Sequence, residues 1–410
     1  MIAEKKPELR FPEFKEEWNS SLIGETLSKV IDYRGKAPPK TDTGVFLITA
    51  RNVRLGYIDF KSKEYIDSTL YSSWMNRGLP NPNDVCFTTE APLGNVCLFP
   101  EHGKFALGQR IITLQTNMEI LFSKFLFQFL LSPVGRKKVL IRGTGSTAKG
   151  IKSKEFVKIP ISYGSIPEQK KIAEFLGAVD EKIRLLQSRY EQLTLFKKGA
   201  MQKIFAQDIR FKADDGSDFP DWEEKALNKV LFETKARNFD LLYNKEQVLS
   251  VSGEKGIVNQ IGHLGRSYAG ASVHNYHIVE TGDIVYTKSP LKANPYGIIK
   301  CNFGTAGIVS TLYAVYRPFD PRSARYLDHY FSIDDNLNKY LRPLVRKGAK
   351  NDMKINNAYV LNDPICIPSP EEQEKIADFL STIDEKIEAV AAQVENMQRF
   401  KKGLLQQMFV

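Results

Sequence analysis

The chain has 410 residues, of which 42% are hydrophobic and 26% are charged, and its formal net charge is +10. This length exceeds what one hydrophobic core supports, and the chain lacks both a run of ~20 apolar residues and a signal-peptide core, so we expect a cytoplasmic protein of several domains. Residues 19–160 carry an excess of +9 and residues 223–364 an excess of +5. Two basic surfaces are typical of nucleic-acid binding, although a solvated lysine-rich surface gives the same count.

The first basic block is predicted to be a β-rich domain that ends in a helix. The strand-like runs are VFLITARNV, DVCFTT, NVCLF and RIITLQT, and SKFLFQFLL follows as an apolar helix. No acidic residue occurs between Glu119 and Glu155, where lysines and arginines surround the glycine-rich GTGSTAKG. Such a loop can bind phosphates through amides, hydroxyls and cations, or can be only a mobile surface turn. The candidate contacts are Arg142, Ser146, Thr147, Lys149 and Lys152.

Residues 166–208 are predicted to form a long helix with one apolar stripe. Pro167 and Glu168 stand in its first turn, where the missing proline N–H costs nothing and a negative charge is favourable. Apolar residues then recur at alternating steps of four and three, which is the period of a coiled-coil seam. The predicted helix-pairing residues are Ile172, Leu176, Val179, Ile183, Leu186, Tyr190 and Leu193.

A polar linker with a Gly-Ser turn leads into the second basic block, which repeats the order of strands followed by helix. Its strand-like runs are VLSVSG, HIVETGDIVYTK, GIIKCNF and STLYAVYRP, and ARYLDHYFSIDDNLNKYL is helical. A second basic loop follows, and we expect it to contact phosphates as the first does. Its candidate contacts are Arg346, Lys347, Lys350, Asn351 and Lys354.

Reading bases requires forked or bidentate side chains such as Arg for guanine and Asn or Gln for adenine. Such groups occur at the ends of predicted strands in both blocks, and each has a structural or phosphate-contacting role as its alternative. The candidates are Arg51, Asn52, Gln109, Arg110, Lys288 and Ser289.

The chain ends in a second long helix, predicted over 367–410, that repeats the first. Positions 168–205 and 372–409 share 18 of 38 residues without a gap, and Trp18 matches Trp222 at the same offset of 204. The second stripe consists of Ile376, Leu380, Ile383, Ile387, Val390, Val394 and Met397. We therefore divide the chain into four parts: a first β-rich domain (1–165), the first repeated helix (166–208), a linker with a second β-rich domain (209–366) and the second repeated helix (367–410).

The two stripes are expected to pack on each other, with each helix packing on its own block as the alternative. Parallel helices of ~60 Å would require the 17-residue linker to extend fully, because 17 residues reach only ~56–61 Å. We therefore predict an antiparallel pair, with Val410 near the start of the first block. The predicted fold class is α+β: two β-rich domains separated by two long antiparallel coiled-coil helices in a pseudo-two-fold duplication.

Catalytic and metal-binding motifs are largely missing from the sequence. Neither a phosphate-binding loop nor a strand-linked G-x-G-x-x-G occurs, and Asn294-Pro295-Tyr296 lacks the second proline of an amino-methyltransferase signature. His274 and His277 lie in a strand-like context, where their spacing points them to opposite faces, so we expect no metal site there. The four cysteines occur singly, and we expect buried free thiols.

The paired motifs PEQKKIAEFLGAVDEKI with LFKKGAMQKIF, and PEEQEKIADFLSTIDEKI with RFKKGLLQQMF, resemble the specificity subunits of type I restriction-modification enzymes. Each pair follows a block with an FP-acid-aromatic segment and a GDIVYTK-like strand, so the resemblance covers essentially the whole chain. It implies two target recognition domains that each read one half of an asymmetric bipartite DNA site, with the helices fixing the spacer.

The resemblance further implies that the chain is not an enzyme and binds no cofactor itself. Two methyltransferase subunits would use S-adenosylmethionine, and motor-nuclease subunits would use ATP-Mg. The repeated Asp180/Asp384, Lys182/Lys386 and Lys197-Lys198/Lys401-Lys402 would form docking surface for the methyltransferases, unless these are solvated charges. The alternatives are a self-contained DNA methyltransferase or nuclease, and a coiled-coil scaffold protein.

Overall fold

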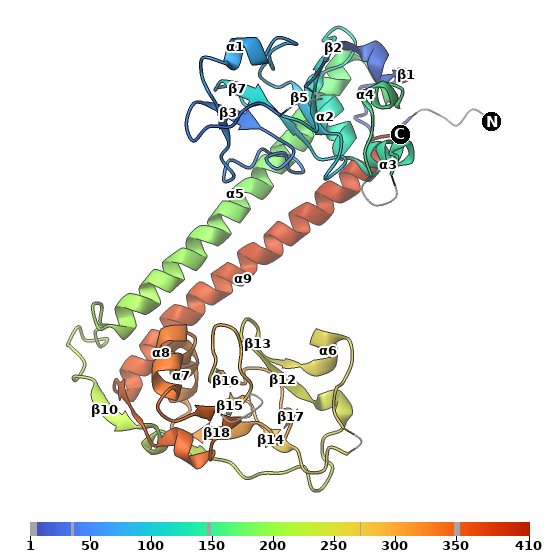
Figure 1. Ribbon diagram of the computed structural model, residues 1–410. Coiled ribbons are helices and arrows are strands. Elements are labelled where there is room, and N and C mark those ends of the chain that lie inside the picture. Colours follow the sequence, from blue (N-terminus) through green and yellow to red (C-terminus); the bar gives the residue numbers. More distant parts are fainter. Residues whose placement is uncertain (1–5, 34–36, 146–148, 271, 348–352) are drawn as a thin grey trace. The chain divides into compact units, whose positions relative to one another are not determined.

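The computed structural model describes residues 6–33, 37–145, 149–270, 272–347 and 353–410. Two compact units make up the chain: unit 1 is Met1–Ser188 with Ala391–Val410, and unit 2 is Arg189–Val390. Each unit combines one β-rich block with parts of the two long helices, α5 (Ile166–Phe205) and α9 (Pro370–Gln407), in Figure 1. Within the described residues, no helix has both the length and the hydropathy to cross a bilayer.

Unit 1 contains two principal sheets. The first is antiparallel, in the order β2 (Leu27–Asp32), β8 (Ile111–Thr116), β5 (Val85–Thr88) and β6 (Val96–Leu98). The second has the order β4 (Tyr65–Ile66), β3 (Val45–Ile48) and β7 (Phe105–Leu107), in which β3 and β7 run parallel. The remaining elements are β1 (Asn19–Leu22) paired with β9 (Pro160–Tyr163), and the helices α1 (Tyr71–Trp74), α2 (Ser123–Leu131), α3 (Pro133–Arg142) and α4 (Ser153–Phe156).

Unit 2 has an equivalent antiparallel sheet in the order β11 (Leu231–Glu233), β18 (Ala314–Pro318), β15 (Ile284–Tyr286) and β16 (Ile299–Cys301). Its paired strands are β10 (Glu223–Ala226) with β21 (Pro364–Ile367), β12 (Leu249–Ser252) with β13 (Gly256–Asn259), β14 (His277–Val279) with β17 (Gly307–Val309), and β19 (Arg346–Lys347) with β20 (Met353–Lys354). Its helices are α6 (Gln260–Leu264), α7 (Arg322–Phe331) and α8 (Asp334–Leu341).

The main core of each unit is built from its sheet, its domain helices and both long helices. In unit 1, Phe125 of α2 and Leu176 of α5 are fully buried in one cluster with Phe409, which follows α9. In unit 2, Ile204 of α5 joins Leu380 of α9 in the corresponding cluster. Both alternatives for the packing of the apolar stripes therefore apply at once, because the same side chains contact the domain and the other long helix.

The long helices run antiparallel, as predicted. Lys401 is paired with Asp180 inside unit 1, and Lys197 with Asp384 at 2.6 Å inside unit 2. From Asp180 to Lys197 the chain advances seventeen residues along α5, while from Lys401 to Asp384 it retreats seventeen along α9. These four charges pair with one another within the chain, which accounts for their recurrence at the repeat offset, and their role as a docking surface stays a prediction.

A buried glutamate holds the first segment of each unit against the start of a long helix. In unit 1, Glu168 is 1% exposed, and it accepts from Arg10 Nε at 2.6 Å and from Trp18 Nε1 at 3.1 Å. In unit 2, Glu372 is fully buried and accepts from Arg210 Nη2 at 2.8 Å and from Trp222 Nε1 at 3.1 Å. We call these two triads the latches. They explain why both tryptophans recur at the repeat offset.

Two sequence expectations need correction here. Nine of the fourteen predicted stripe residues are buried, but Tyr190 is 40% exposed and does not belong to a core. Cys366 is an exposed free thiol, because it lies on the outward face of β21, whereas the other three cysteines are buried. The end of the chain does lie by the first block, since Leu9 N–H donates to the Gln407 carbonyl at 3.0 Å.

Candidate nucleic-acid interface

In unit 1, three of the predicted base-reading residues lie around one depression. β3 and β7 are parallel neighbours with Ile48 opposite Leu107, so the loops after both strands leave the sheet at the same edge. The first loop carries Arg51, and the second carries Gln109 and Arg110. Together with Lys40 and Glu64 they line a depression of about 290 Å³, which we call the edge hollow.

A glycine allows the two loops to approach closely. Gly108 N–H donates to the Ile48 carbonyl at 2.8 Å, and a Cβ on Gly108 would lie 2.8 Å from a Thr49 methyl group. Arg110 adopts a left-handed backbone conformation, with φ of 67°, which directs the chain out of the turn and back into β8. The hollow is therefore formed by backbone geometry before any ligand binds.

Carboxylates orient the cations of the edge hollow. Glu64 accepts from Lys40 at 2.8 Å and lies 3.7 Å from an Arg51 nitrogen, and Glu90 pairs with Arg110 at 3.1 Å. The Arg51 and Arg110 side chains remain 77% and 54% exposed, so their remaining donors are accessible. Forked donors beside carboxylates suit base edges, since Arg binds guanine and a carboxylate accepts from cytosine N4.

The predicted basic loop joins the same face of unit 1. Its base closes through hydrogen bonds between Thr144 and Gly150, and Ile151 N–H donates to the Thr89 carbonyl at 2.8 Å. Thr89 N–H in turn donates to the Arg110 carbonyl at 2.9 Å, so the loop adjoins the edge hollow. Lys149 and Lys152 are exposed and Arg142 is half-buried, whereas Ser146 and Thr147 lie outside the described residues.

Among the unit 1 candidates that the structure describes, Asn52 alone does not belong to this surface. It is 1% exposed, and its carboxamide accepts from Thr49 and donates to the carbonyls of Asp59 and Ser62. All of its hydrogen-bonding capacity is used to hold the loop after β3, so a base could engage it only by breaking these bonds. Its role as a DNA contact is therefore withdrawn.

In unit 2, Lys288 and Ser289 follow β15. Lys288 is half-buried, and burial lowers the pKa of its ammonium group. Close by, His277 is 3% exposed, its Nδ1 has no hydrogen-bond partner among the described residues, and its pKa is lowered to about 4. The lowering has burial as its first cause and the charges of Arg237 and Lys288 as the next. His277 is therefore neutral, and within the described residues no group of acids, histidines and cysteines can hold a metal.

The second basic loop, like the first, is closed at its base by paired backbone. In the backbone register, Arg346 lies opposite Lys354 and Lys347 lies opposite Met353, so strands β19 and β20 form the paired base of a hairpin. Lys350 and Asn351 lie outside the described residues. The structure thus puts a paired hairpin base after the domain helices in each unit.

Sequence reasoning missed the residues that orient the cations in the edge hollow. Lys40 and Glu64 come together because Thr41 forms an antiparallel bridge with Tyr65 of β4, a two-residue strand whose short run gives no periodic signal. β7 was likewise not predicted, since a run of only three apolar residues is too short to show a strand period. The glycine before Gln109 was the available signal, because glycine often marks a close approach of two backbones.

Residues 39–195 match the family model described as "Type I restriction modification DNA specificity domain". The chain is 23% identical over 422 residues to the type I restriction enzyme MjaVIII specificity subunit of Methanocaldococcus jannaschii, covering 97% of this chain and 92% of that protein. It is also 28% identical over 208 residues to the putative type I restriction enzyme MjaX specificity subunit of the same organism, covering 49% and 45% of the two chains.

Solved structures share the fold at low sequence identity. The type I restriction-modification S subunit from M. genitalium superposes with a TM-score of 0.59 at 14% identity over 99% of each chain. A chain from a structure of a type I R-M system, described by its complex assembly and conformational transition, superposes with a TM-score of 0.51 at 18% identity over 97% of this chain and 98% of that one. Residues 39–195 thus match a type I restriction-modification DNA specificity domain in sequence, and over nearly its whole length this chain is similar in sequence and fold to type I specificity subunits.

Proposed function

We propose that this chain is the non-catalytic DNA-reading component of a type I restriction-modification complex. Each unit would read one half of an asymmetric bipartite site, and α5 and α9 would set the spacer. The observation that carries the proposal is the edge hollow, where parallel pairing of β3 and β7 brings Arg51, Gln109 and Arg110 together beside a basic loop. Phosphate contacts position such a surface on DNA and forked side chains then specify bases.

The two half-sites would differ because the two reading surfaces differ. Unit 1 presents exposed arginines held by Glu64 and Glu90. Unit 2 presents Lys288 and Ser289 near a buried neutral histidine. Different donor sets recognise different base edges, so one chain can specify an asymmetric sequence.

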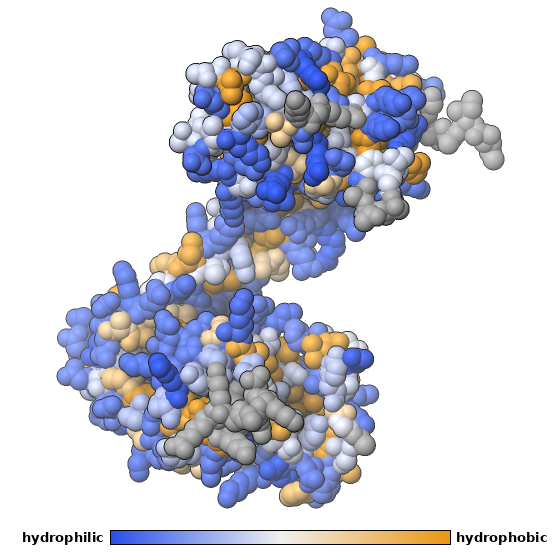
Figure 2. Space-filling model, in the orientation of Figure 1, coloured by the Kyte–Doolittle hydropathy of each residue, from blue (hydrophilic) through white to orange (hydrophobic). Residues whose placement is uncertain are grey.

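Two methyltransferase subunits would dock on equal surfaces of the long helices. Figure 2 shows a largely hydrophilic surface with apolar residues in small groups. Phe196 on α5 and Phe400 on α9 are repeat equivalents, and they are 56% and 50% exposed. Lys198 and Lys402, each two residues further on, are exposed as well. Exposed aromatic side chains are typical interface anchors, and equal anchors fit two copies of one partner.

Cofactors would be bound by the partners rather than by this chain. S-adenosylmethionine would serve the methyltransferase subunits, and ATP-Mg would serve motor-nuclease subunits joined through them. Purified chain, DNA and S-adenosylmethionine should give no methyl transfer, and addition of the modification subunits should give methylated adenines at one bipartite sequence. Methyl transfer by the chain alone would favour the alternative of a self-contained methyltransferase.

Salt dependence separates DNA binding from a scaffold role. If the basic surfaces bind Z phosphates, the logarithm of the association constant should fall with the logarithm of salt concentration with a slope near −0.9Z. The variant Lys149→Ala, compared with the parent chain, should weaken binding to all sequences and reduce the magnitude of the slope by about one. A chain that serves only as a scaffold would show no salt-dependent DNA affinity.

A further inference from the structure

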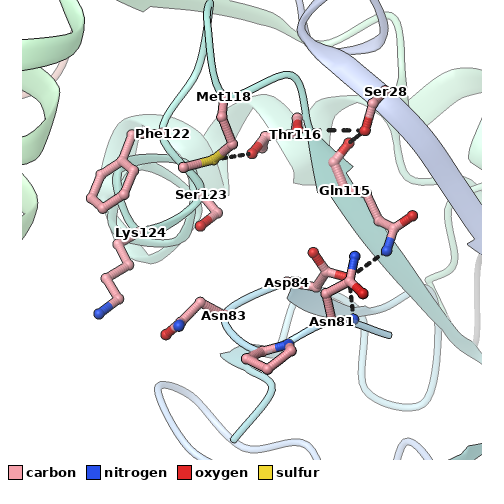
Figure 3. Close-up of a pocket in the computed structure, with 11 residues that line it drawn as sticks. Ser28, Asn81, Asn83, Asp84, Gln115, Thr116, Met118, Phe122, Ser123 and Lys124 are labelled. Atoms are coloured by element: carbon pink, nitrogen blue, oxygen red, sulfur yellow. Dashed lines mark hydrogen bonds between the residues drawn. The ribbon is translucent and has the colours of Figure 1, made fainter. Parts of the chain in front are cut away.

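A second depression of unit 1, away from the edge hollow, contains a buried carboxyl group. It has a volume of about 410 Å³ and lies between the turn before β5, the end of β8 and the start of α2. We call it the Asp84 pocket, and Figure 3 shows how its side chains converge. Those that matter here are Asn83, Asp84, Gln115, Met118, Phe122 and Lys124.

The carboxyl group of Asp84 is only partly satisfied. Asp84 is 8% exposed, and its Oδ2 accepts from Asn81 N–H and from Gln115 Nε2, both at 2.7 Å. Its Oδ1 has no hydrogen-bond partner and no cation among the described residues, and burial raises the pKa of the group. The amine of Lys124 points away from it in Figure 3. A buried carboxylate without a cation is costly, so a bound cation would recover free energy.

The equivalent position of unit 2 shows which cation fits. Asp283 precedes β15 as Asp84 precedes β5, and it accepts from the N–H three residues earlier in the same way. There, however, Arg317 of β18 binds it with Nε at 2.7 Å and Nη2 at 2.9 Å. In the strand registers, Arg317 of unit 2 corresponds to Gln115 of unit 1. Unit 1 therefore keeps the carboxylate and lacks the guanidinium.

We propose that the Asp84 pocket binds the guanidinium group of a ligand, which supplies the positive charge that Arg317 supplies to Asp283 in unit 2. The planar cation donates two parallel hydrogen bonds to Asp84, and the Gln115 and Asn83 carboxamides offer further acceptors. Its methylene stem packs on Met118, which is 50% exposed, and its face lies on Phe122. An ammonium group lacks the fork, so it binds less well than a guanidinium.

The guanidinium has two possible sources, a free small molecule or an arginine side chain of a modification subunit. The second source rests on the proposed function and the first does not. Agmatine serves as the probe, cadaverine as the ammonium control, and calorimetry on the full-length chain as the measurement. The variant Gln115→Arg adds a guanidinium group of the chain itself beside Asp84, and Asp84→Asn removes the negative charge of the pocket.

For a free ligand, agmatine should bind one site per chain at least tenfold more tightly than cadaverine, with the binding lost in both variants. Arg317→Gln, which frees Asp283 in unit 2, should raise the number of agmatine sites to two. Gln115→Arg reproduces a pair that already exists in this protein, so it keeps the test valid if Arg317→Gln does not fold.

For an arginine of a partner, both Asp84→Asn and Gln115→Arg should weaken assembly with the modification subunits at least tenfold, and agmatine should compete. DNA binding by the chain should stay unchanged in either case, which separates this inference from the proposed function. If agmatine binds Gln115→Arg as well as it binds the parent chain, or if neither agmatine binding nor assembly depends on Asp84, the proposal is wrong.

Discussion

Units 1 and 2 share an interior and differ at their surfaces. Both have a latch and an interhelical lysine–aspartate pair, and the residues that match at the offset of 204 include Glu168 and Glu372. The second sheet of unit 1, β4–β3–β7, has a weaker counterpart in unit 2, where β12 pairs with β13, β14 pairs with β17, and one parallel bridge joins Val248 to Ile308. Sequence identity between the two units is thus kept where two helices and a domain pack against one another.

The difference shows how one duplicated frame can carry two specificities. Buried polar groups tolerate little change, because removing one partner leaves the other unsatisfied in a medium of low polarity. Loops that leave a sheet edge can change their side chains at little cost in stability. The comparison therefore predicts equal effects for changes in the two latches and unequal effects for changes at the surfaces.

The largest effects should come from the latches. Glu168→Ala leaves Arg10 without its carboxylate and Trp18 without an acceptor, and Glu372→Ala does the same to Arg210 and Trp222. Each substitution should lower the free energy of unfolding by about 3–5 kcal/mol, which is typical when one partner of a buried ion pair is removed.

Denaturant unfolding followed by tryptophan fluorescence measures this loss, since one tryptophan lies in each latch. Glu174→Ala, an exposed change on α5, is the control and should cost less than 0.5 kcal/mol, or about the scatter of neutral surface changes. A large loss in one latch and a small loss in the other would show that the frame is not shared.

At the surface, Arg51→Ala should affect one half-site only. The side chain is 77% exposed, so its loss leaves the fold intact. If it reads a base, the affinity for the cognate site should fall by about 1–3 kcal/mol, with relaxed preference at one base pair. Mapping of methylated adenines by the assembled complex measures this, and an equal relaxation in both half-sites would contradict the assignment of one half-site to each unit.

How much of the fold can be predicted from the sequence depends on the kind of interaction that forms each element. The long helices were predictable because period and repeat are local properties of the chain, and α2 was predicted with its bounds, Ser123–Leu131. The run HIVETGDIVYTK forms two strands rather than one, since Glu280 and Asp283 make a turn between β14 and β15. The basic segment after α2 was recognised by charge, but its helix α3 was not predicted.

The candidate site was only partly predictable. Arg51, Gln109 and Arg110 were selected for their chemistry, and their proximity depends on a parallel pair of strands that are far apart in sequence. Asn52 has the same chemistry but is turned into the core. Composition does not distinguish an exposed carboxamide from a buried one, so the sequence alone could not separate these residues.

Acid should destabilise unit 2 more than unit 1. His277 and His329 are buried, and burial lowers their pKa values to about 4 and about 3. The unfolded chain takes up protons below about pH 6.5 and the folded chain does not, so stability falls as pH falls from about 6.5 towards those values. At pH 5 the loss of stability is at most about 2 kcal/mol for each histidine. This value is RT times the natural logarithm of the factor 1 + 10^(pKa − pH) for the unfolded chain divided by the same factor for the folded chain.

The change His329→Gln tests this, because Gln128 lies beside the ion pair of unit 1 as His329 does beside that of unit 2. The variant should lose less stability than the parent chain between pH 7 and pH 5 in urea unfolding. Asp328, whose pKa is raised by burial, works in the opposite direction but is present in both proteins. Equal acid sensitivity in the two proteins would show that His329 is not responsible.

The smallest expected difference concerns the interhelical pairs themselves. Asp180 of unit 1 accepts from Lys401 and also from Gln128 Nε2 at 3.0 Å, whereas Asp384 of unit 2 has only Lys197 as a hydrogen-bond donor among the described residues. Lys401→Ala therefore leaves its aspartate one donor, and Lys197→Ala leaves its aspartate none.

Both aspartates are 37% exposed, so water compensates part of each loss, and the costs should be about 0.5 and about 1 kcal/mol respectively. Double-mutant cycles with Asp180→Ala and Asp384→Ala isolate the two pair energies from the loss of lysine packing. Adding Gln128→Ala to Lys401→Ala should raise the cost in unit 1 to that in unit 2. If the two costs are already equal without it, the amide adds nothing to the pair, and the asymmetry between the units is confined to their surfaces.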